Sequence, residues 1–111
     1  MKGCVFCKMI DGEIPTEKIY EDDKVFVIKD MFPKAKVHLL VIPKLHIDSL
    51  FEVQEEHSDL LGYVMTSLKN FAKEQGFKGF RTIINTGPGS GQQIFHLHFH
   101  ILGGEGKLVG F

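Results

Sequence analysis

The sequence has no apolar run that approaches the roughly 20 residues of a membrane-spanning helix, although 43% of its 111 residues are hydrophobic. The N-terminal stretch MKGCVFCKMIDG also lacks the uninterrupted apolar region of a signal peptide, because Lys8 and Asp11 break it. Both absences argue against a membrane or secreted protein. We therefore expect a cytoplasmic location.

An excess of charge of one sign is also missing. Lysine and arginine number 13 against 14 acidic residues, for a net charge of −1, and no basic block is present to follow a nucleic-acid backbone. We expect no general DNA or RNA binding. Repeats, low-complexity segments and linkers are absent too, and the length suits one hydrophobic core, so a single domain over residues 1–111 is predicted.

Cysteine is scarce. The two that occur, Cys4 and Cys7, form a C-x-x-C pair near the N-terminus. In a reducing compartment such a pair favours metal ligation or redox chemistry over a structural disulfide. A zinc ion would need two further ligands, so the pair alone is a weak signal.

The apolar pattern predicts strands combined with two helical segments. Val5 to Ile10 suits one or two helical turns, and apolar residues at helical spacing from Glu52 to Gln75 predict a long amphipathic helix capped by Gly76. The predicted strands are the two arms of a hairpin, residues 19–20 and 25–30, and the segments 37–43, 80–85 and 92–102, with a glycine-rich loop at 86–91. Since only one segment could serve as a parallel crossover, we expect an α+β fold with a mainly antiparallel sheet.

The last predicted strand has a histidine at every second position. Side chains alternate between the faces of a strand, so His96, His98 and His100 are expected on one face. The opposite face is expected to be buried core, formed by Phe95, Leu97, Phe99 and Ile101. The histidine face should therefore line a polar site.

Three neighbouring imidazoles repel one another when charged, so they must be neutral or paired with an anion or a metal. A catalytic metal is chemically sound, because His-x-His on a strand can direct two nitrogens at one zinc. The loop from Thr86 to Gly91 favours phosphate, since its backbone amides can approach an anion. Further amide donors flank it at Asn85, Gln92 and Gln93.

The stretch HLHFHIL resembles the motif H-φ-H-φ-H-φ-φ, with φ apolar, that names the histidine triad (HIT) family. The similarity extends over FCKMIDGEIP, YEDDKVFVIKDMFPKAKVHLLVIPKLHI and NTGPGSGQQIFHLHFHILGG, and DGEIP, IPKLHI and HILGG resemble the Hint branch of purine nucleoside phosphoramidases. The resemblance implies a five-stranded antiparallel sheet with one short and one long helix. It also implies a homodimer in which two sheets join into one.

The same resemblance assigns roles to residues. It implies that His98 is the nucleophile, with its other ring nitrogen held by a backbone carbonyl, and that His100 donates to a nonbridging phosphate oxygen. His96 and His46 would pass a proton to the amine leaving group. The nucleoside is expected to contact Asp30 at the ribose and an apolar base pocket built from Val5, Phe6, Met9, Ile28 and Met31.

Some bacterial HIT proteins place a similar C-x-x-C beside two histidines to bind zinc. The matching positions are Cys4, Cys7, His46 and His96, a set that suits tetrahedral zinc. A zinc-bound His46 or His96 could not also carry protons, so a structural zinc and a proton relay are alternatives here. Catalysis itself is expected to need no cofactor.

The implied reaction is hydrolysis of the P–N bond of purine nucleoside 5′-phosphoramidates, with aminoacyl-adenylates as a further substrate class, through a nucleotidyl-histidine. The alternatives are a dinucleoside polyphosphate hydrolase and a purine-nucleotide-binding regulatory protein. Two departures from the family bear on substrate choice. Gln93 stands where many Hint proteins have a serine, and the sequence stops at Phe111 where relatives often carry a longer tail.

Overall fold

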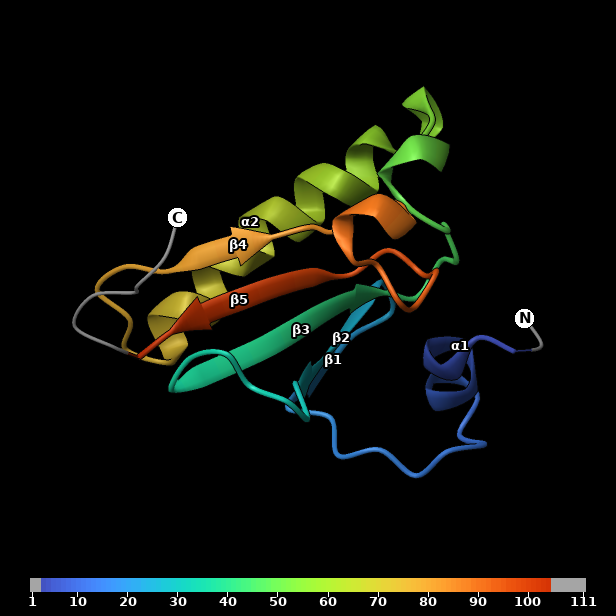
Figure 1. The fold of residues 1–111 in the computed structure, drawn as a ribbon. Helices are drawn as coiled ribbons and strands as arrows, with labels where there is room; N and C mark the ends of the chain where they lie inside the picture. The colour runs from blue at the N-terminus through green and yellow to red at the C-terminus, as the bar shows by residue number, and fades with distance from the viewer. Residues whose placement is uncertain (1–2, 105–111) are drawn as a thin grey trace.

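A computed structural model describes residues 3–104, which form a five-stranded antiparallel sheet with strand order β1-β2-β3-β5-β4 and two α-helices (Figure 1). The elements in chain order are α1 (Val5–Ile10), β1 (Tyr20–Glu21), β2 (Val25–Lys29), β3 (Val37–Pro43), α2 (Ser58–Glu74), β4 (Arg81–Ile83) and β5 (Phe99–Gly103). The expected α+β fold is confirmed. Within these residues no helix has the length and hydropathy to cross a membrane. The tail after Gly104 lies outside the described residues.

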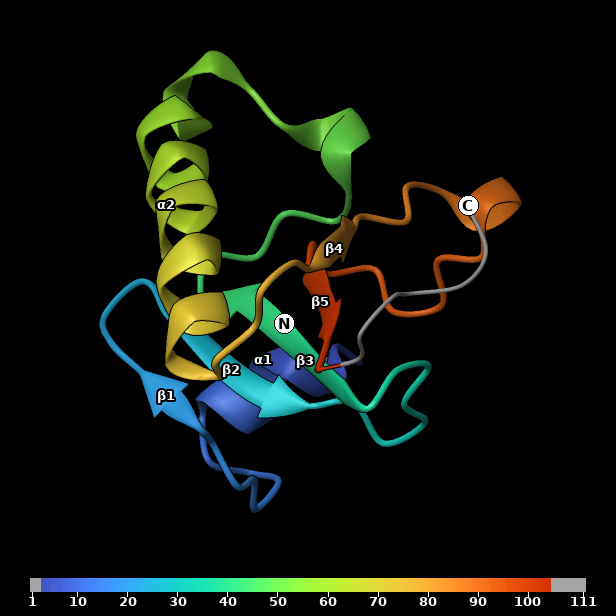
Figure 2. The same cartoon turned by 90° about the vertical axis from the view of Figure 1, so that its left-hand side faces the viewer.

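Each face of the sheet carries its own hydrophobic core. Along β2, Val25 and Val27 pack with α2, whereas Phe26 and Ile28 pack with α1, because successive side chains of a strand point to opposite faces. The apolar run of β3 divides between the two cores in the same way. α2 and α1 therefore cover opposite faces of the sheet (Figure 1 and Figure 2).

The long helix begins later than the sequence pattern predicts. Two short 3₁₀ turns, Leu50–Glu52 and Glu55–His57, precede α2, and Val53 between them is extended with ψ 134°. The extended Val53 separates the first turn from the helix, so the predicted start at Glu52 is wrong. The C-terminal end is as expected. Gly76 adopts φ 76° and its N–H donates to the Lys73 carbonyl, which is the left-handed helix cap that glycine favours.

The histidine strand is also shorter than predicted, because β5 begins at Phe99. Two carbonyls before it are taken by side chains, since Ile94 O accepts from Gln92 Nε2 and His96 O lies 2.7 Å from His98 Nδ1. Neither carbonyl is therefore used in backbone pairing between strands, and the strand starts only after them. Leu97, Phe99 and Ile101 are buried in the core under α2 as expected, but Phe95 is 43% exposed, so its predicted burial is wrong.

The short helix α1 has only six residues, too few for stability in isolation. Its buried side chains, Phe6 and Cys7, attach it to the sheet face opposite α2. Cys4 caps its N-terminus, with Sγ 3.3 Å from the backbone nitrogen of Cys7. α1 thus depends on side chains near the histidine strand for its position.

Candidate functional site

A pocket of about 570 Å³ opens on the α1 face of the sheet. Nine residues that the sequence assigns to substrate binding all line it: Val5, Phe6, Met9, Ile28, Asp30, Met31, Asn85, Gln92 and Gln93. His98 and His100 line it as well. The volume is in the range of small-molecule sites, and apolar walls with a few polar groups are typical of them.

His98 is held in one tautomer. Its Nδ1 lies 2.7 Å from the backbone oxygen of His96, so Nδ1 carries the ring proton and donates it to that carbonyl. The lone pair of the neutral ring is therefore on Nε2. Burial lowers the pKa of His98 below its ordinary 6.5, and the neutral ring prevails at neutral pH.

His100 is held in the opposite tautomer by a neighbour on β3. The backbone N–H of Lys34 donates to His38 Nδ1 at 3.0 Å, so His38 carries its proton on Nε2. His38 Nε2 in turn lies 2.8 Å from His100 Nδ1 and donates to it. The His100 proton is consequently on Nε2. Burial, followed by the charges of His98 and His38, lowers the pKa of His100 to about 4, so this ring is a neutral donor.

The sequence reasoning did not assign a function to His38. It is buried and lines the pocket, and its Nε2 is 3.5 Å from Asp30 Oδ2. The sequence did contain a signal, because His38 is a polar residue inside the apolar run VHLLVIP. A polar side chain buried in a strand often has a specific partner or function. Asp30 also has a local role, since its Oδ1 accepts from the backbone N–H of Phe32.

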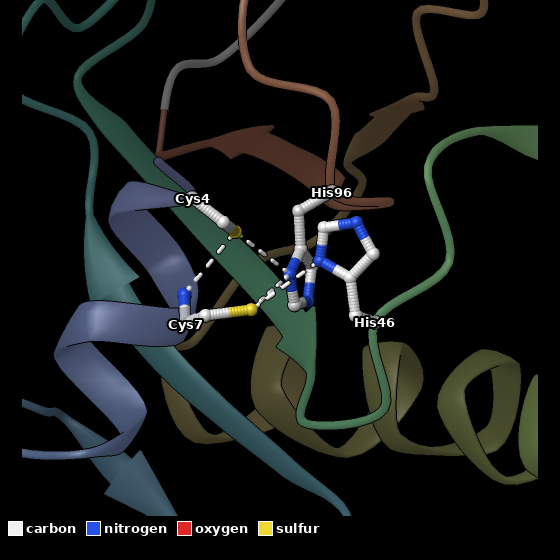
Figure 3. Close-up of side chains that lie close together, drawn as sticks. All are labelled: Cys4, Cys7, His46 and His96. Carbon is white, nitrogen blue, oxygen red and sulfur yellow. Dashed lines mark hydrogen bonds between the residues drawn. The ribbon is translucent and has the colours of Figure 1, made fainter. Parts of the chain in front are cut away.

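A second cluster brings together Cys4, Cys7, His46 and His96 (Figure 3). Cys4 Sγ lies 3.3 Å from His96 Nδ1, and Cys7 Sγ lies 3.3 Å from His46 Nδ1. All four ligand atoms are within 4.8 Å of one another. Cys7 lies on α1 and Cys4 is its N-cap residue, while His46 comes from the segment after β3 and His96 from the segment before β5.

The protonation pattern of this cluster suits a metal ion. His96 Nε2 donates to the backbone oxygen of Pro43 at 2.7 Å, and His46 Nε2 donates to Asp48 Oδ1 at 2.6 Å. Both rings therefore direct an unprotonated Nδ1 at the sulfurs, which is how metal-binding histidines are commonly oriented. Burial, followed by the hydrogen bond with Cys4, raises the pKa of the Cys7 thiol to about 11, so thiolates here need a cation.

The trio Asp30, His38 and His100 also has ligand atoms close together. Its tautomers do not suit a metal, because the Lys34 N–H occupies His38 Nδ1 and keeps the proton on Nε2, between the two rings. The structure therefore separates a hydrogen-bonded pair at the pocket from a metal-type cluster beside it.

The chain matches the family model described as Scavenger mRNA decapping enzyme C-term binding over residues 3–109. Protein HitA of Neisseria gonorrhoeae is 49% identical over 104 residues, covering 93% of this chain and 97% of the relative. A histidine triad protein from Clostridium difficile superposes with a TM-score of 0.92 at 43% identity, covering 100% of this chain and 97% of that one.

The chain belongs to the histidine triad family.

Within the HIT family the chain falls in the Hint-like branch. The Adenylylsulfatase HINT1 of Arabidopsis thaliana is 41% identical, covering 91% of this chain and 71% of the relative. The 14 kDa zinc-binding protein of Brassica juncea is 43% identical, covering 91% of this chain and 92% of the relative.

The geometry of this HIT protein engages both expected proton-relay residues, His46 and His96, in other hydrogen bonds. His96 is fully buried, at 0% exposure, and neither His96 nor His46 is among the residues that line the pocket. Their Nδ1 atoms face sulfur and their Nε2 atoms donate to oxygen, so every ring nitrogen of the two residues already has a partner. Of the two alternatives drawn from the sequence, the structure favours metal binding.

The glycine-rich loop also differs from expectation. Its amides at Gly87, Ser90, Gly91 and Gln92 donate within the loop, which includes the 3₁₀ turn Pro88–Ser90. The side-chain amide of Gln92 donates to Asp48 O and Ile94 O. These groups hold the loop in shape instead of remaining available to an anion. Asn85 and Gln93 are the pocket amides that remain candidates for phosphate contact.

We expect ¹⁵N NMR of the imidazole rings near neutral pH to place the proton of His98 on Nδ1 and those of His38 and His100 on Nε2. As the pH falls through 6.5 the three rings should remain neutral, because burial lowers each pKa below that value. A pH titration of the two-bond N–H correlations measures both properties. A shared tautomer for His98 and His100, or titration of either ring at or above 6.5, would contradict the hydrogen-bond pattern.

Proposed function

We propose that this HIT protein is a nucleotide hydrolase that cleaves the P–N bond of purine nucleoside 5′-phosphoramidates, with aminoacyl-adenylates as a second substrate class. The observation that carries the proposal is the fixed tautomer of His98, which gives a pocket-lining imidazole a lone pair on Nε2 at neutral pH. A neutral imidazole is a competent nucleophile toward phosphorus. The adenylylsulfatase name of the Arabidopsis relative supports nucleotide hydrolysis in general.

In the proposed first step His98 Nε2 attacks the α-phosphorus and forms a P–N bond, while the bond to the amine breaks. The amine takes up a proton from solvent, since His96 and His46 are engaged elsewhere. Water then attacks phosphorus and gives up a proton to solvent, the P–Nε2 bond breaks, and a nucleoside monophosphate leaves. His98 is regenerated with the proton still on Nδ1, where it donates to the His96 carbonyl.

His100 suits stabilisation of the charge that develops on phosphate. It is a neutral Nε2–H donor because His38 occupies its Nδ1. A donor that is oriented before the reaction lowers the barrier without reorganisation. The apolar residues Val5, Phe6, Met9, Ile28 and Met31 would hold the purine, and Asp30 the ribose.

We expect His98→Ala to lower kcat/KM for an adenosine phosphoramidate by about a thousandfold or more, because the nucleophile is lost. Binding of AMP, measured by calorimetry, should survive because the pocket walls are intact. Wild-type protein quenched during turnover should show an adenylylated mass that the variant lacks. The matched control is His57→Ala, whose ring lies at the start of α2 and should leave turnover unchanged. Normal turnover in the His98 variant would overturn the mechanism.

The alternative functions are separated by a substrate panel. Dinucleoside polyphosphates, adenylyl sulfate and phosphoramidates compared at equal concentration give the preferred leaving group. Preference for dinucleoside polyphosphates would identify the polyphosphate hydrolase instead. Nucleotide binding without turnover of any of them would identify the regulatory protein.

We further propose that Cys4, Cys7, His46 and His96 hold one structural zinc. The support is the convergent ligand set and the donation of both Nε2 protons away from it. The zinc-binding name of the Brassica relative agrees with this. A bound zinc would supply the positive charge that two buried thiolates need, and the proposed hydrolysis uses no cofactor.

Elemental analysis of protein purified without chelators or a His tag should find one zinc per chain. Cys7→Ser should reduce the zinc content to near zero, because a ligand is lost, whereas His57→Ala, outside the cluster, should retain it. Wild-type protein with no metal and two thiols that react freely would rule the site out.

The homodimer predicted from the resemblance is supported by the edge of the sheet. Within residues 3–104, β4 is the last strand in the order, and edge strands are the places where sheets of two chains can join. Apolar side chains are exposed nearby, including Ile83 on β4, and Met65 on α2 is 54% exposed. We propose that two β4 edges pair, with α2 contributing to the interface.

Sedimentation velocity should show a dimer for the wild type. Met65→Lys should raise the dimer dissociation constant by about tenfold or more, since it places a charge in an apolar contact. Thr66→Lys alters the next, exposed residue of the same helix and should remain dimeric. A Met65→Lys variant that remains as dimeric as the wild type would place this part of α2 outside the interface.

The single-domain organisation of residues 1–111 and the cytoplasmic location remain proposals. The first is supported by the match of the family model to residues 3–109. The second is supported by the two free cysteines, which suit a reducing compartment.

A further inference from the structure

His96 belongs to the cysteine cluster and is hydrogen-bonded to His98, which lines the pocket. Its imidazole Nδ1 faces the sulfurs of Cys4 and Cys7, at 3.3 and 3.5 Å. Its backbone oxygen accepts a hydrogen bond from His98 Nδ1 at 2.7 Å. The orientation of the nucleophile therefore depends on the position of a residue whose side chain lies in the cluster.

α1 joins the two sites a second time. Cys4 and Cys7 belong to the cluster, while Val5, Phe6 and Met9 line the pocket. The ring of Phe6 packs edge-on against both His96 and His98, with centroid distances of 5.7 and 5.2 Å. A helix of six residues has little stability of its own, so side-chain anchors set its position.

We propose that occupancy of the cluster by zinc controls nucleotide binding in the neighbouring pocket, with His96 and α1 as the two mechanical links. His96 is a positioning residue here, acting on the substrate only through the His98 ring. Loss of the ion releases Cys4 and Cys7, and α1 then no longer holds the apolar wall of the pocket in place. The inference rests on the proposed nucleotide and zinc sites and adds that they are energetically coupled.

Coupling between two binding sites is reciprocal. If zinc tightens nucleotide binding by some factor, the nucleotide must tighten zinc binding by the same factor. The coupling can therefore be measured from the zinc side, as the effect of the nucleotide on zinc affinity. If zinc has no influence on the pocket, the zinc dissociation constant will be the same with and without nucleotide.

The experiment is a competition between the zinc-loaded protein and a chromogenic chelator, with and without saturating AMP. We expect AMP to lower the apparent zinc dissociation constant by about fivefold or more, the lower end of usual coupling factors. A mixture of AMP, zinc and chelator without protein corrects for zinc bound by AMP itself. An unchanged zinc dissociation constant, or a protein that holds no zinc against the chelator, overturns the proposal.

Two phenylalanine variants test the route. Phe6→Leu removes the ring that touches both histidines, whereas Phe26→Leu makes the same change at a buried position of the same core, on β2. The AMP effect should shrink in Phe6→Leu and persist in Phe26→Leu. An equal effect in both would overturn the assignment to α1. Turnover of a phosphoramidate is recorded separately. An active enzyme whose zinc affinity does not change with AMP refutes the coupling alone. A protein whose zinc affinity changes with AMP but that shows no turnover refutes only the proposed reaction.

Discussion

A neutral imidazole has one ring nitrogen that donates and one that accepts, so whatever bonds the first nitrogen decides what the second can do. The protonated nitrogen of each triad histidine in this HIT protein is assigned from that constraint. The His96 carbonyl accepts a hydrogen bond from His98 Nδ1 and leaves the lone pair of that ring on Nε2. His38 occupies Nδ1 of His100 and makes its Nε2 a donor. Pro43 O accepts from Nε2 of His96, whose Nδ1 faces sulfur.

The three histidines of the alternating triad therefore differ in which ring nitrogen carries the proton and in what the other nitrogen faces. Alternation along the chain directs them to one side but says nothing of their tautomers. His96 O decides the tautomer of His98, and partners on β3 decide those of His96 and His100. His96 precedes β5 and its ring faces Cys4 at the start of α1, so its side chain belongs to the cysteine cluster. His98 and His100 lie farther along and line the pocket. The two sites are adjacent because consecutive members of one short motif supply both.

The sequence anticipated what periodicity and local signals determine. The bounds of β3, the Gly76 cap and the burial of Leu97, Phe99 and Ile101 follow from spacing and residue type. The role of His38 could not be obtained that way, because it depends on the β3–β5 register that sets Leu40 opposite His100. The start of β5 was missed because side chains capture the carbonyls of Ile94 and His96, which no propensity describes.

Burial gives the two sites opposite requirements on the same sheet face. At His98 and His100 it disfavours the charged ring, lowers each pKa and keeps both rings neutral. At Cys7 the same burial disfavours the thiolate and raises its pKa. An apolar environment that suits the proposed nucleophile is thus unfavourable for thiolates beside it, unless a cation compensates their charge. A divalent ion in the cluster would compensate the thiolates while the surroundings of the imidazoles stayed apolar. This is the physical reason to expect that binding of the ion and binding in the pocket affect each other.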